Sequence, residues 1–482
     1  MSFRDIYLGV ISSANEVVSR NDASELSRVC MMLLRYQELA KVRVLIHAAN
    51  WDDPVVLQQV PALSQYLWLA GDVDGALRLL EHSKKSLHAS APLLYSLGMA
   101  LRSAGRMEEA AEAFEAAVGM DPDFAPAHWS LATHQRAAEK GARLPRLRAA
   151  LQRATTAESG AEILYALHRE LDHAGEIERA FKALDAGMTL KRKSVRYDAP
   201  VQAAAVKRIR QWMDAEDDET RGERGFRPVF VVGMPRSGTT LLERMLSQLD
   251  GVYSAGELRD FEMAVSHQSN EYYRGMDDAA VLAQLPDVLA SGVGRRYRER
   301  VATLLPSPDV RMIDKYPGNF FNVPLIAQAL PDARIVAVVK SPMDSGFSNL
   351  KELFADDAYA YSYAQREVAE HYVTMLELAR AFAERYPRQF LAVSYDQLVQ
   401  EPERVLKAVC DFADLPFDPA ATDVTRNASS VSTASATQVR EKVHPGFLGN
   451  WRKYGEYLQP MRDRFVEMGV EPESVPEFLR VS

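Results

Sequence analysis

The stretch Pro228-Val-Phe-Val-Val-Gly-Met-Pro-Arg-Ser-Gly-Thr-Thr-Leu-Leu-Glu243 decides the fold of the second half of this chain. It predicts a buried β-strand over Val229–Val232, then a tight Gly/Pro loop, then a helix over Thr239–Leu249. In such a loop, consecutive backbone N–H groups lie at the positive end of a helix, which is an arrangement that binds phosphate. We therefore expect an anion-binding loop between this strand and this helix.

The positive charge of this loop has an unusual position. Gly233 and Gly238 keep the glycine spacing of P-loop NTPases, but Thr239 stands where those enzymes carry Lys. A cation occurs instead inside the loop, at Arg236, whose planar guanidinium suits phosphate or sulfate oxygens. We therefore expect a phosphorylated nucleotide, while the absent Lys argues against a nucleotide kinase. The structural alternative is a Gly/Pro turn with an exposed Arg.

The run Pro235–Leu241 after an apolar strand resembles the 5′-phosphosulfate loop of sulfotransferases that use 3′-phosphoadenosine 5′-phosphosulfate (PAPS). It is close to the form shared by tyrosylprotein sulfotransferases and their bacterial relatives. The resemblance implies an α/β domain with a P-loop-like parallel sheet, and PAPS as co-substrate without a metal. It also implies that these residues bind the phosphosulfate: Arg236, Ser237, Gly238, Thr239 and Thr240.

A second family-like segment follows the predicted strand Arg334–Val339. In the family an Arg at the strand end and a Ser eight residues later contact the 3′-phosphate, and here Lys340 and Ser348 stand at those positions. Lys340 departs from the family because Lys lacks the bidentate fork of Arg. Ser341 is a second departure, since the family usually has Asp there. Without the family, Lys340 is a charged residue that follows a strand.

The resemblance also implies the catalytic residues. Glu257 lies where tyrosylprotein sulfotransferases carry the acidic residue that deprotonates the acceptor, and Glu262 is the fallback. An exposed Glu at a helix start is the alternative reading. Lys315, followed two residues later by Pro, matches a family Lys that stabilises charge in the transition state. His267 is the one histidine that suggests a base of another kind.

Two more segments resemble the family near the carboxyl end of the chain. Tyr395 comes after the predicted buried strand Phe390–Val393, and a family Tyr that lies near the nucleotide also follows a strand. A polar run with Ser435, Gln438 and Arg440 resembles the loop that closes over PAPS. The resemblance spans about residues 226–465, and its motifs occur in the order of the family.

The first half of the chain has apolar spacings of three and four, which predict an all-helical region. One window matches the 34-residue tetratricopeptide pattern through Leu94, Leu97, Gly98, Leu101, Ala110, Phe114, Ala117 and Pro122. We expect a solenoid of three or four repeats over residues 1–213, a charged linker over 214–225 and a sulfotransferase domain over 226–482. Such an array binds a peptide or partner protein, or it serves packing and dimerisation.

Composition limits the remaining possibilities. The net charge of −9 over 482 residues argues against a general nucleic-acid binder. Two distant cysteines, Cys30 and Cys410, fit a reducing cytoplasm, and no apolar stretch is long enough to span a membrane. We expect transfer of a sulfuryl group to a hydroxyl, with a tyrosine of a peptide or protein as one acceptor class and a glycan or small metabolite open. The alternative is a tetratricopeptide scaffold whose sulfotransferase domain binds nucleotide but is inactive.

Overall fold

The computed structural model describes residues 2–20, 22–84, 86–134, 139–215, 222–355, 359–427 and 443–481. They form two compact units. The helical unit extends to Ser194, and the sheet unit comprises Val195–Asn427 with residues 443–481. The helix α12 (Ala199–Asp214) belongs to the sheet unit because it packs against α15 (Ala279–Gln284) and α17 (Val323–Ala329). This division lies one helix before the predicted end of the helical domain at residue 213, and the predicted linker lies partly outside the described residues.

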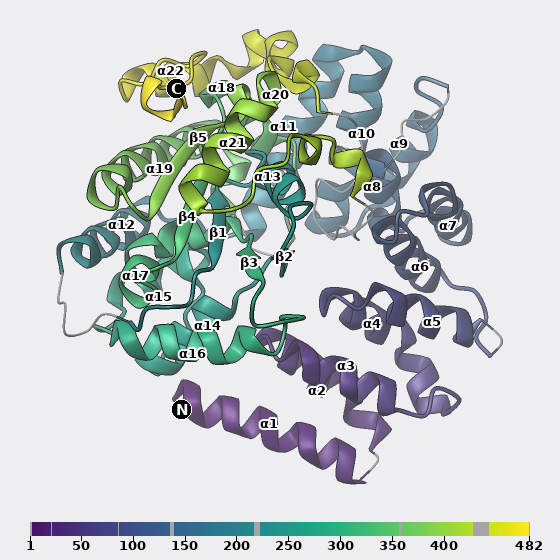
Figure 1. Ribbon diagram of the computed structural model, residues 1–482. Helices are drawn as coiled ribbons and strands as arrows, with labels where there is room; N and C mark the ends of the chain where they lie inside the picture. Colours follow the sequence, from purple (N-terminus) through teal and green to yellow (C-terminus); the bar gives the residue numbers. More distant parts are fainter. Residues whose placement is uncertain are drawn as a thin grey trace. The chain divides into compact units, whose positions relative to one another are not determined.

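The described part of the helical unit contains α-helices and a 3₁₀ turn, as the spacing of apolar residues predicts (Figure 1). Its α-helices are α1 (Phe3–Arg20), α2 (Leu26–Arg35), α3 (Leu39–Ala48), α4 (Pro54–Leu69), α5 (Val73–Ser83), α6 (Ala91–Ser103), α7 (Met107–Met120), α8 (Ala125–His134), α9 (Leu144–Arg153), α10 (Ala157–Ala174) and α11 (Ile177–Ser194). The pairs α4 and α5, α6 and α7, and α10 and α11 each pack together.

The pair α6 and α7 is the predicted tetratricopeptide repeat. Gly98 lies so near the fully buried Phe114 that a Cβ atom on Gly98 would be 2.5 Å from the ring. Gly105 connects the two helices with φ +83°, a conformation that residues with a side chain rarely adopt. The absence of a side chain at Gly98 therefore lets α6 and α7 pack closely.

Replacing Gly98 with Ala should destabilise the helical unit by about 1–3 kcal/mol, because the added methyl overpacks a buried ring. Gly119 in α7 is the matched control, since a Cβ atom there meets nothing within 4 Å. Gly119→Ala should stabilise the unit by about 0.5–1 kcal/mol, the ordinary gain for Ala over Gly in a helix. Urea unfolding of both variants measures the two effects. Equal changes of the same sign would show that Phe114 does not limit this position.

The sheet unit is built on a five-stranded parallel sheet of order β2-β3-β1-β4-β5. The strands are β1 (Val229–Gly233), β2 (Val252–Ser254), β3 (Arg311–Asp314), β4 (Arg334–Val339) and β5 (Phe390–Ser394). The predicted strands β1, β4 and β5 are confirmed. Periodicity did not predict β2 and β3 because they have only three and four residues.

Helices cover the sheet (Figure 1). Besides α12, α15 and α17 they are α13 (Thr239–Leu246), α14 (Asp260–Ser269), α16 (Ala290–Ala302), α18 (Pro342–Leu350), α19 (Gln365–Arg385), α20 (Tyr395–Gln400), α21 (Pro402–Ala413) and α22 (Gln459–Glu467). One core joins the sheet to α13 and α21 and includes Val231, Leu242 and Val409. All residues of β1 are buried, as expected for a central strand with both faces covered. This packing places the loop after β1 at the carboxyl edge of the sheet.

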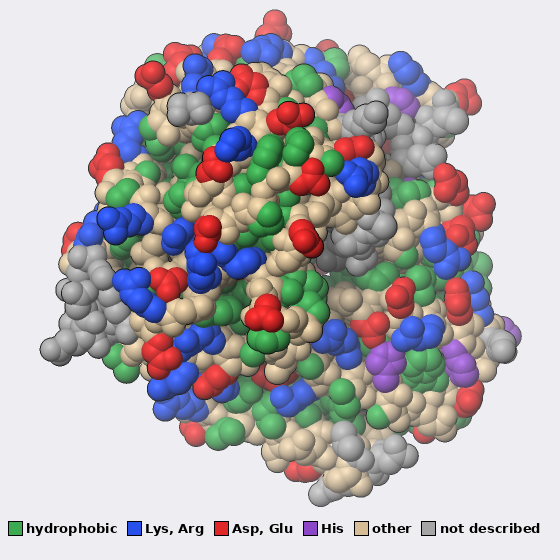
Figure 2. Space-filling view, in the orientation of Figure 1, with side chains coloured by type: hydrophobic (Ala, Val, Ile, Leu, Met, Phe, Trp, Pro, Cys, Tyr) green, Lys and Arg blue, Asp and Glu red, His purple; other side chains and the backbone are tan. Residues whose placement is uncertain are grey.

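The distribution of charged side chains on the surface and the hydropathy of the helices agree with the amino-acid composition. Figure 2 shows acidic and basic side chains interspersed across the face in view, as the similar totals of 57 basic and 66 acidic residues lead one to expect. Among the helices of the described ranges, none is long and apolar enough to cross a membrane.

Candidate functional site

The loop between β1 and α13 has the backbone that an anion-binding loop requires. Gly238 precedes α13 with φ +102°, and the non-glycine residue Arg236 also has a positive φ, of 67°. The aromatic ring of Tyr395 packs directly on Gly238, since a Cβ atom there would be 2.2 Å from the ring. Both the conformation and the close contact therefore require glycine at position 238.

The helix α18, which follows β4, holds this loop in place. The side-chain amide of Asn349 donates hydrogen bonds to the carbonyl oxygens of Pro235 (2.9 Å) and Ser345 (3.0 Å). The Ser345 hydroxyl contacts the sulfur of Met234 at 3.3 Å. The anion loop and the segment after β4, far apart in sequence, thus form one structural assembly.

The structure brings Lys340, Ser348 and Tyr395 to the same place as the loop. Lys340 Nζ donates to Ser348 Oγ at 3.3 Å and lies 4.9 Å from the ring centroid of Tyr395. Burial lowers the pKa of Lys340, acidic neighbours oppose this shift, and the positive charge of Arg236 adds to it. Lys340 and Arg236 therefore act on each other as two buried positive charges.

The donors of the loop fit a bound anion. The Arg236 side chain is mostly buried, and its Nε lies 3.7 Å from a carboxylate oxygen of Glu352. The Ser237 hydroxyl is fully buried and has no hydrogen-bond partner among the described residues. A buried hydroxyl without a partner costs free energy unless a ligand or water supplies one. Thr239 and Thr240 begin α13, so the positive end of that helix faces the same loop.

The predicted catalytic pair also comes together. The ammonium of Lys315 forms an ion pair with Glu257, and its Nζ lies 3.6 Å from a carboxylate oxygen of Glu243 in α13. Lys315 is 1% exposed and Glu257 42% exposed, so Glu257 is the member of the pair that solvent and ligands can reach. Burial works against the charge of Lys315, but Glu257 and Glu243 outweigh it and raise the pKa of the ammonium.

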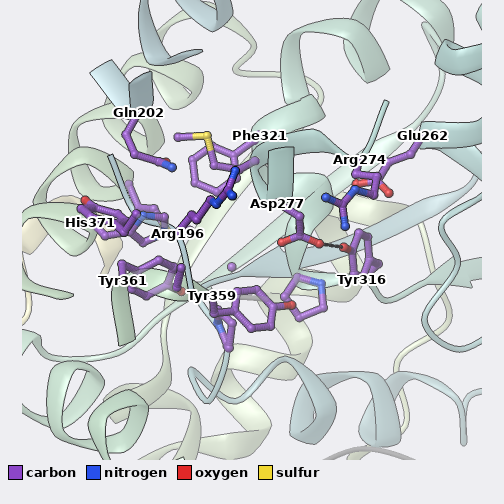
Figure 3. A pocket seen from close by; sticks show the side chains of 18 residues that line it. Arg196, Gln202, Glu262, Arg274, Asp277, Tyr316, Phe321, Tyr359, Tyr361 and His371 are labelled. Atoms are coloured by element: carbon purple, nitrogen blue, oxygen red, sulfur yellow. Dashed lines mark hydrogen bonds between the residues drawn. The ribbon is translucent and has the colours of Figure 1, made fainter. Parts of the chain in front are cut away.

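A cavity adjoins both the loop and the residues that follow Lys315 (Figure 3). Tyr359 and Tyr361 lie on one side of it and Phe321 on another. Its lining comprises Arg196, Tyr197, Gln202, Gly233, Pro235, Glu262, Arg274, Met276, Asp277, Tyr316, Pro317, Gly318, Phe321, Tyr359, Ala360, Tyr361, His371 and Met375. An aromatic wall of this kind suits a planar or apolar ligand group.

Two titratable groups in this cavity are poorly suited to the role of base. Burial raises the pKa of Glu262 to about 7, but its carboxylate is only 1% exposed and is paired with Arg259 at 2.7 Å, so a ligand has little access to it. The His371 ring stacks on Tyr361 with a centroid separation of 3.6 Å, and burial lowers its pKa to about 3. His267, in α14, lies 3.5 Å from a guanidinium nitrogen of Arg296. This geometry favours Glu257 over Glu262 and the histidines.

Residues 228–419 match the sequence model of the sulfotransferase family. This part of the chain is a sulfotransferase domain. Residues 91–124, which contain α6 and α7, match a tetratricopeptide repeat. The sulfotransferase domain thus contains the anion loop and the predicted residues around it, and it follows a region with a tetratricopeptide repeat.

The sequence of the chain is also similar to two curated proteins. The chain is 28% identical over 401 residues to an uncharacterized protein of Aquifex aeolicus (strain VF5), covering 80% of this chain and 52% of the relative. It is 21% identical over 189 residues to a putative protein-tyrosine sulfotransferase of Caenorhabditis briggsae, covering 39% of this chain and 66% of the relative. The chain spans less than two thirds of the length of each of these curated relatives.

Solved structures similar to the chain include two sulfotransferases. The sulfotransferase domain from the curacin biosynthetic pathway has 16% identity and a TM-score of 0.35, covering 52% of this chain and 99% of that one. Sulfotransferase STF1 from Mycobacterium tuberculosis H37Rv has 15% identity and a TM-score of 0.31, covering 68% of this chain and 99% of that one.

Three predicted site residues cannot be placed in the structure, and two residues that contact the site were not predicted. Ser435, Gln438 and Arg440 lie outside the described residues. Sequence reasoning missed Glu243 and Asn349. Glu243 lies four residues after Thr239, so helical spacing places both on one side of α13, and this signal could have identified it. No spacing rule relates Asn349 to the loop that it holds.

Proposed function

We propose that this protein is a PAPS-dependent sulfotransferase that transfers a sulfuryl group to an acceptor hydroxyl. The observation that carries the proposal is that the β1–α13 loop and the segment after β4, both predicted to bind phosphate, lie next to each other. Lys340 and Ser348 meet the β1–α13 loop through Tyr395, whose ring touches both Gly238 and Lys340. Two buried cations beside an anion loop suit a ligand with phosphate groups at two positions.

The chain offers a distinct set of donors for each end of PAPS. Arg236, Ser237 and the amino end of α13 would hold the 5′-phosphosulfate, and Lys340 with Ser348 would hold the 3′-phosphate. When bound, PAPS supplies the sulfuryl group, whose bond to the 5′-phosphate oxygen breaks as the acceptor oxygen bonds to sulfur. Arg236 and Lys315 would stabilise the negative charge that develops on the leaving phosphate oxygen.

Glu257 would accept the proton of the acceptor hydroxyl, since it is a carboxylate at the solvent-accessible side of the Lys315 ion pair. The aromatic cavity would receive the acceptor. Its tyrosines and Phe321 suit a phenolic ring, which agrees with the description of the Caenorhabditis briggsae relative as a putative protein-tyrosine sulfotransferase. A tyrosine of a peptide or protein is therefore the acceptor class that we propose first, with the tetratricopeptide region as its docking surface.

Calorimetric titration with PAP, the desulfated product, tests the nucleotide site. We expect a Kd below about 100 µM, equivalent to about −5.5 kcal/mol. Absence of binding at that level would refute the enzyme proposal. Incubation with ³⁵S-labelled PAPS and a desalted cell extract then tests transfer. PAP binding without label transfer would favour the alternative, a tetratricopeptide scaffold with an inactive sulfotransferase domain.

Substitution of Lys340 tests the 3′-phosphate site. Lys340→Met should weaken PAP binding by about 10- to 100-fold, the loss of one charged hydrogen-bond donor. Because burial lowers the pKa of Lys340, its charge is lost below the usual lysine range, so PAP affinity should already fall as the pH rises toward that range. Lys340→Arg should abolish this fall, since Arg stays protonated. Calorimetry between pH 7.5 and 10 checks both results, with the exposed Lys407→Met as control.

A reducing compartment such as the cytoplasm belongs to the same proposal. Cys30 in α2 and Cys410 in α21 are both free and buried. Burial raises the pKa of each thiol to about 12. Neither thiol is therefore suited to nucleophilic chemistry near neutral pH, and both behave as small apolar core residues.

A further inference from the structure

Lys315 lies between two carboxylates that belong to different parts of the sheet unit. Glu257 follows β2, and its carboxylate forms an ion pair with the Lys315 ammonium. Glu243 lies in α13, the helix that begins at the anion loop, with a carboxylate oxygen 3.6 Å from Lys315 Nζ. The buried Lys315 ammonium is thus shared by Glu257, the proposed base, and by Glu243, a second carboxylate that has no role in the proposed mechanism.

The two carboxylates differ in how firmly they are held. Glu243 is 13% exposed, and its other carboxylate oxygen accepts a hydrogen bond from the Ser254 hydroxyl at 2.5 Å. Glu257 is 42% exposed, and the preceding Gly256 has φ +78° with nothing within 4 Å of its Cβ position. Glu243 is anchored by its own helix and by β2, whereas Glu257 is the more exposed of the two carboxylates.

The ion pair between Glu257 and Lys315 opposes the proposed role of Glu257 as a base, and Glu243 can compensate for the loss of that pair. A carboxylate paired with an ammonium is a weak base, because the positive charge stabilises its ionised form. Glu257 must therefore leave Lys315 to accept a proton. Lys315 is 1% exposed, and burial alone would favour its neutral form. A second carboxylate is needed to keep Lys315 charged at that moment, and Glu243 is in place to do so.

The remaining titratable groups near this pair do not take over that function. Asp314, next to Lys315 in the chain, is fully buried and accepts a hydrogen bond from the Tyr297 hydroxyl at 2.7 Å. Burial raises the pKa of Asp314 well above its usual value, and the charge of Glu243 adds to this shift. The buried hydroxyl of Tyr359 is near enough to Glu257 for its pKa to be raised further by that carboxylate, and it carries no compensating negative charge near neutral pH.

We propose that Glu243 is a positioning residue that holds the Lys315 ammonium in place and charged while Glu257 leaves it to take the acceptor proton. This inference rests on the proposed roles of Glu257 and Lys315. The acceptor proton goes to the Glu257 carboxylate, and Lys315 keeps its own proton throughout. Glu243 exchanges no proton and touches no substrate.

Three variants test this role: Glu243→Gln, Glu243→Asp and the control Glu403→Gln, which removes an exposed carboxylate in α21. Glu243→Gln should lower ³⁵S transfer from labelled PAPS into a desalted cell extract by about tenfold or more, because Glu257 stays bound to Lys315. PAP affinity by calorimetry should stay within about threefold of the unmodified protein, since the loop donors are intact. Glu243→Asp keeps the charge and should restore most of the transfer, and Glu403→Gln should change neither quantity.

A crystal structure of the PAP complex gives a readout that does not depend on turnover. We expect Lys315 Nζ to remain within about 4 Å of Glu243 in that complex. The inference is overturned if Lys315 leaves Glu243 in that complex, or if Glu243→Gln transfers sulfate as Glu403→Gln does. It is also overturned if Glu243→Gln loses PAP affinity and thermal stability together with transfer, which would show a purely structural role. Failure of the unmodified protein to bind PAP would instead refute the proposed function itself.

Discussion

Glu257→Gln should lower the rate of sulfuryl transfer by about 10²- to 10⁴-fold, the contribution of a positioned general base. The amide of Gln has nearly the shape of the carboxylate but cannot take the acceptor proton. PAP affinity should be retained, because the predicted phosphate ligands Arg236, Lys340 and Ser348 are unchanged. The measurements are initial rates of label transfer from PAPS at saturating nucleotide, and calorimetric titration with PAP.

Glu262→Gln is the comparison variant for this prediction. Glu262 is buried and paired with Arg259. Replacing Glu262 should therefore lower the midpoint of thermal unfolding more than replacing the exposed Glu257 does. Loss of transfer in Glu262→Gln at unchanged thermal stability, with full activity in Glu257→Gln, would assign the base to Glu262. Such a result would contradict our reading of the site.

The second large effect is expected at Arg236. Arg236→Gly should weaken PAP binding by about 100-fold or more, because a guanidinium forms charge-assisted and often bidentate hydrogen bonds with phosphate or sulfate oxygens. Glycine is the informative replacement since Arg236 has φ +67°. A glycine adopts this conformation without the cost of about 1–2 kcal/mol that other residues bear, so the loop should keep its shape. Calorimetry with PAP and thermal unfolding measure the two quantities.

The expected pattern for Arg236→Gly is a loss of PAP affinity with no loss of thermal stability. Arg404→Ala, which removes an exposed Arg paired with Glu401 in the same unit, should leave PAP affinity unchanged. Arg236→Lys should retain part of the binding, because it keeps the charge but not the fork. Unchanged PAP affinity in Arg236→Gly would show that the loop arginine is not a nucleotide ligand.

Long elements with strong local patterns could be predicted from the sequence. The apolar runs of β1, β4 and β5 marked three strands of the sheet, and the Gly98 and Phe114 spacing marked the α6 and α7 pair. The predicted helix at Thr239 was assigned three residues too many, since it ends at Leu246. Short elements such as β2 carried no periodic signal, because three residues do not establish an alternation.

Some residues of the candidate site were predicted from the sequence, and others were not. Arg236 was predicted from the strand, loop and helix motif itself, whereas Glu257, Lys340 and Ser348 were predicted from the resemblance to the sulfotransferase family. The aromatic cavity was not found, because Tyr361 and Phe321 come from separate segments and resemble ordinary core residues. Their common location follows from contacts with His371 of α19, whose ring centroid lies 3.6 Å from that of Tyr361 and 5.6 Å from that of Phe321.

The sequence by itself determined the strand, loop and helix around Arg236, because a continuous apolar run, glycine conformation and helix start signals act between near neighbours in the chain. Only the tertiary structure decided which distant charges meet. Lys315 lies 58 residues from Glu257 along the chain, and Tyr395 reaches Gly238 across the edge of the sheet. The strand order β2-β3-β1-β4-β5 produces these contacts, and that order results from burial and pairing of whole strands that no local pattern specifies.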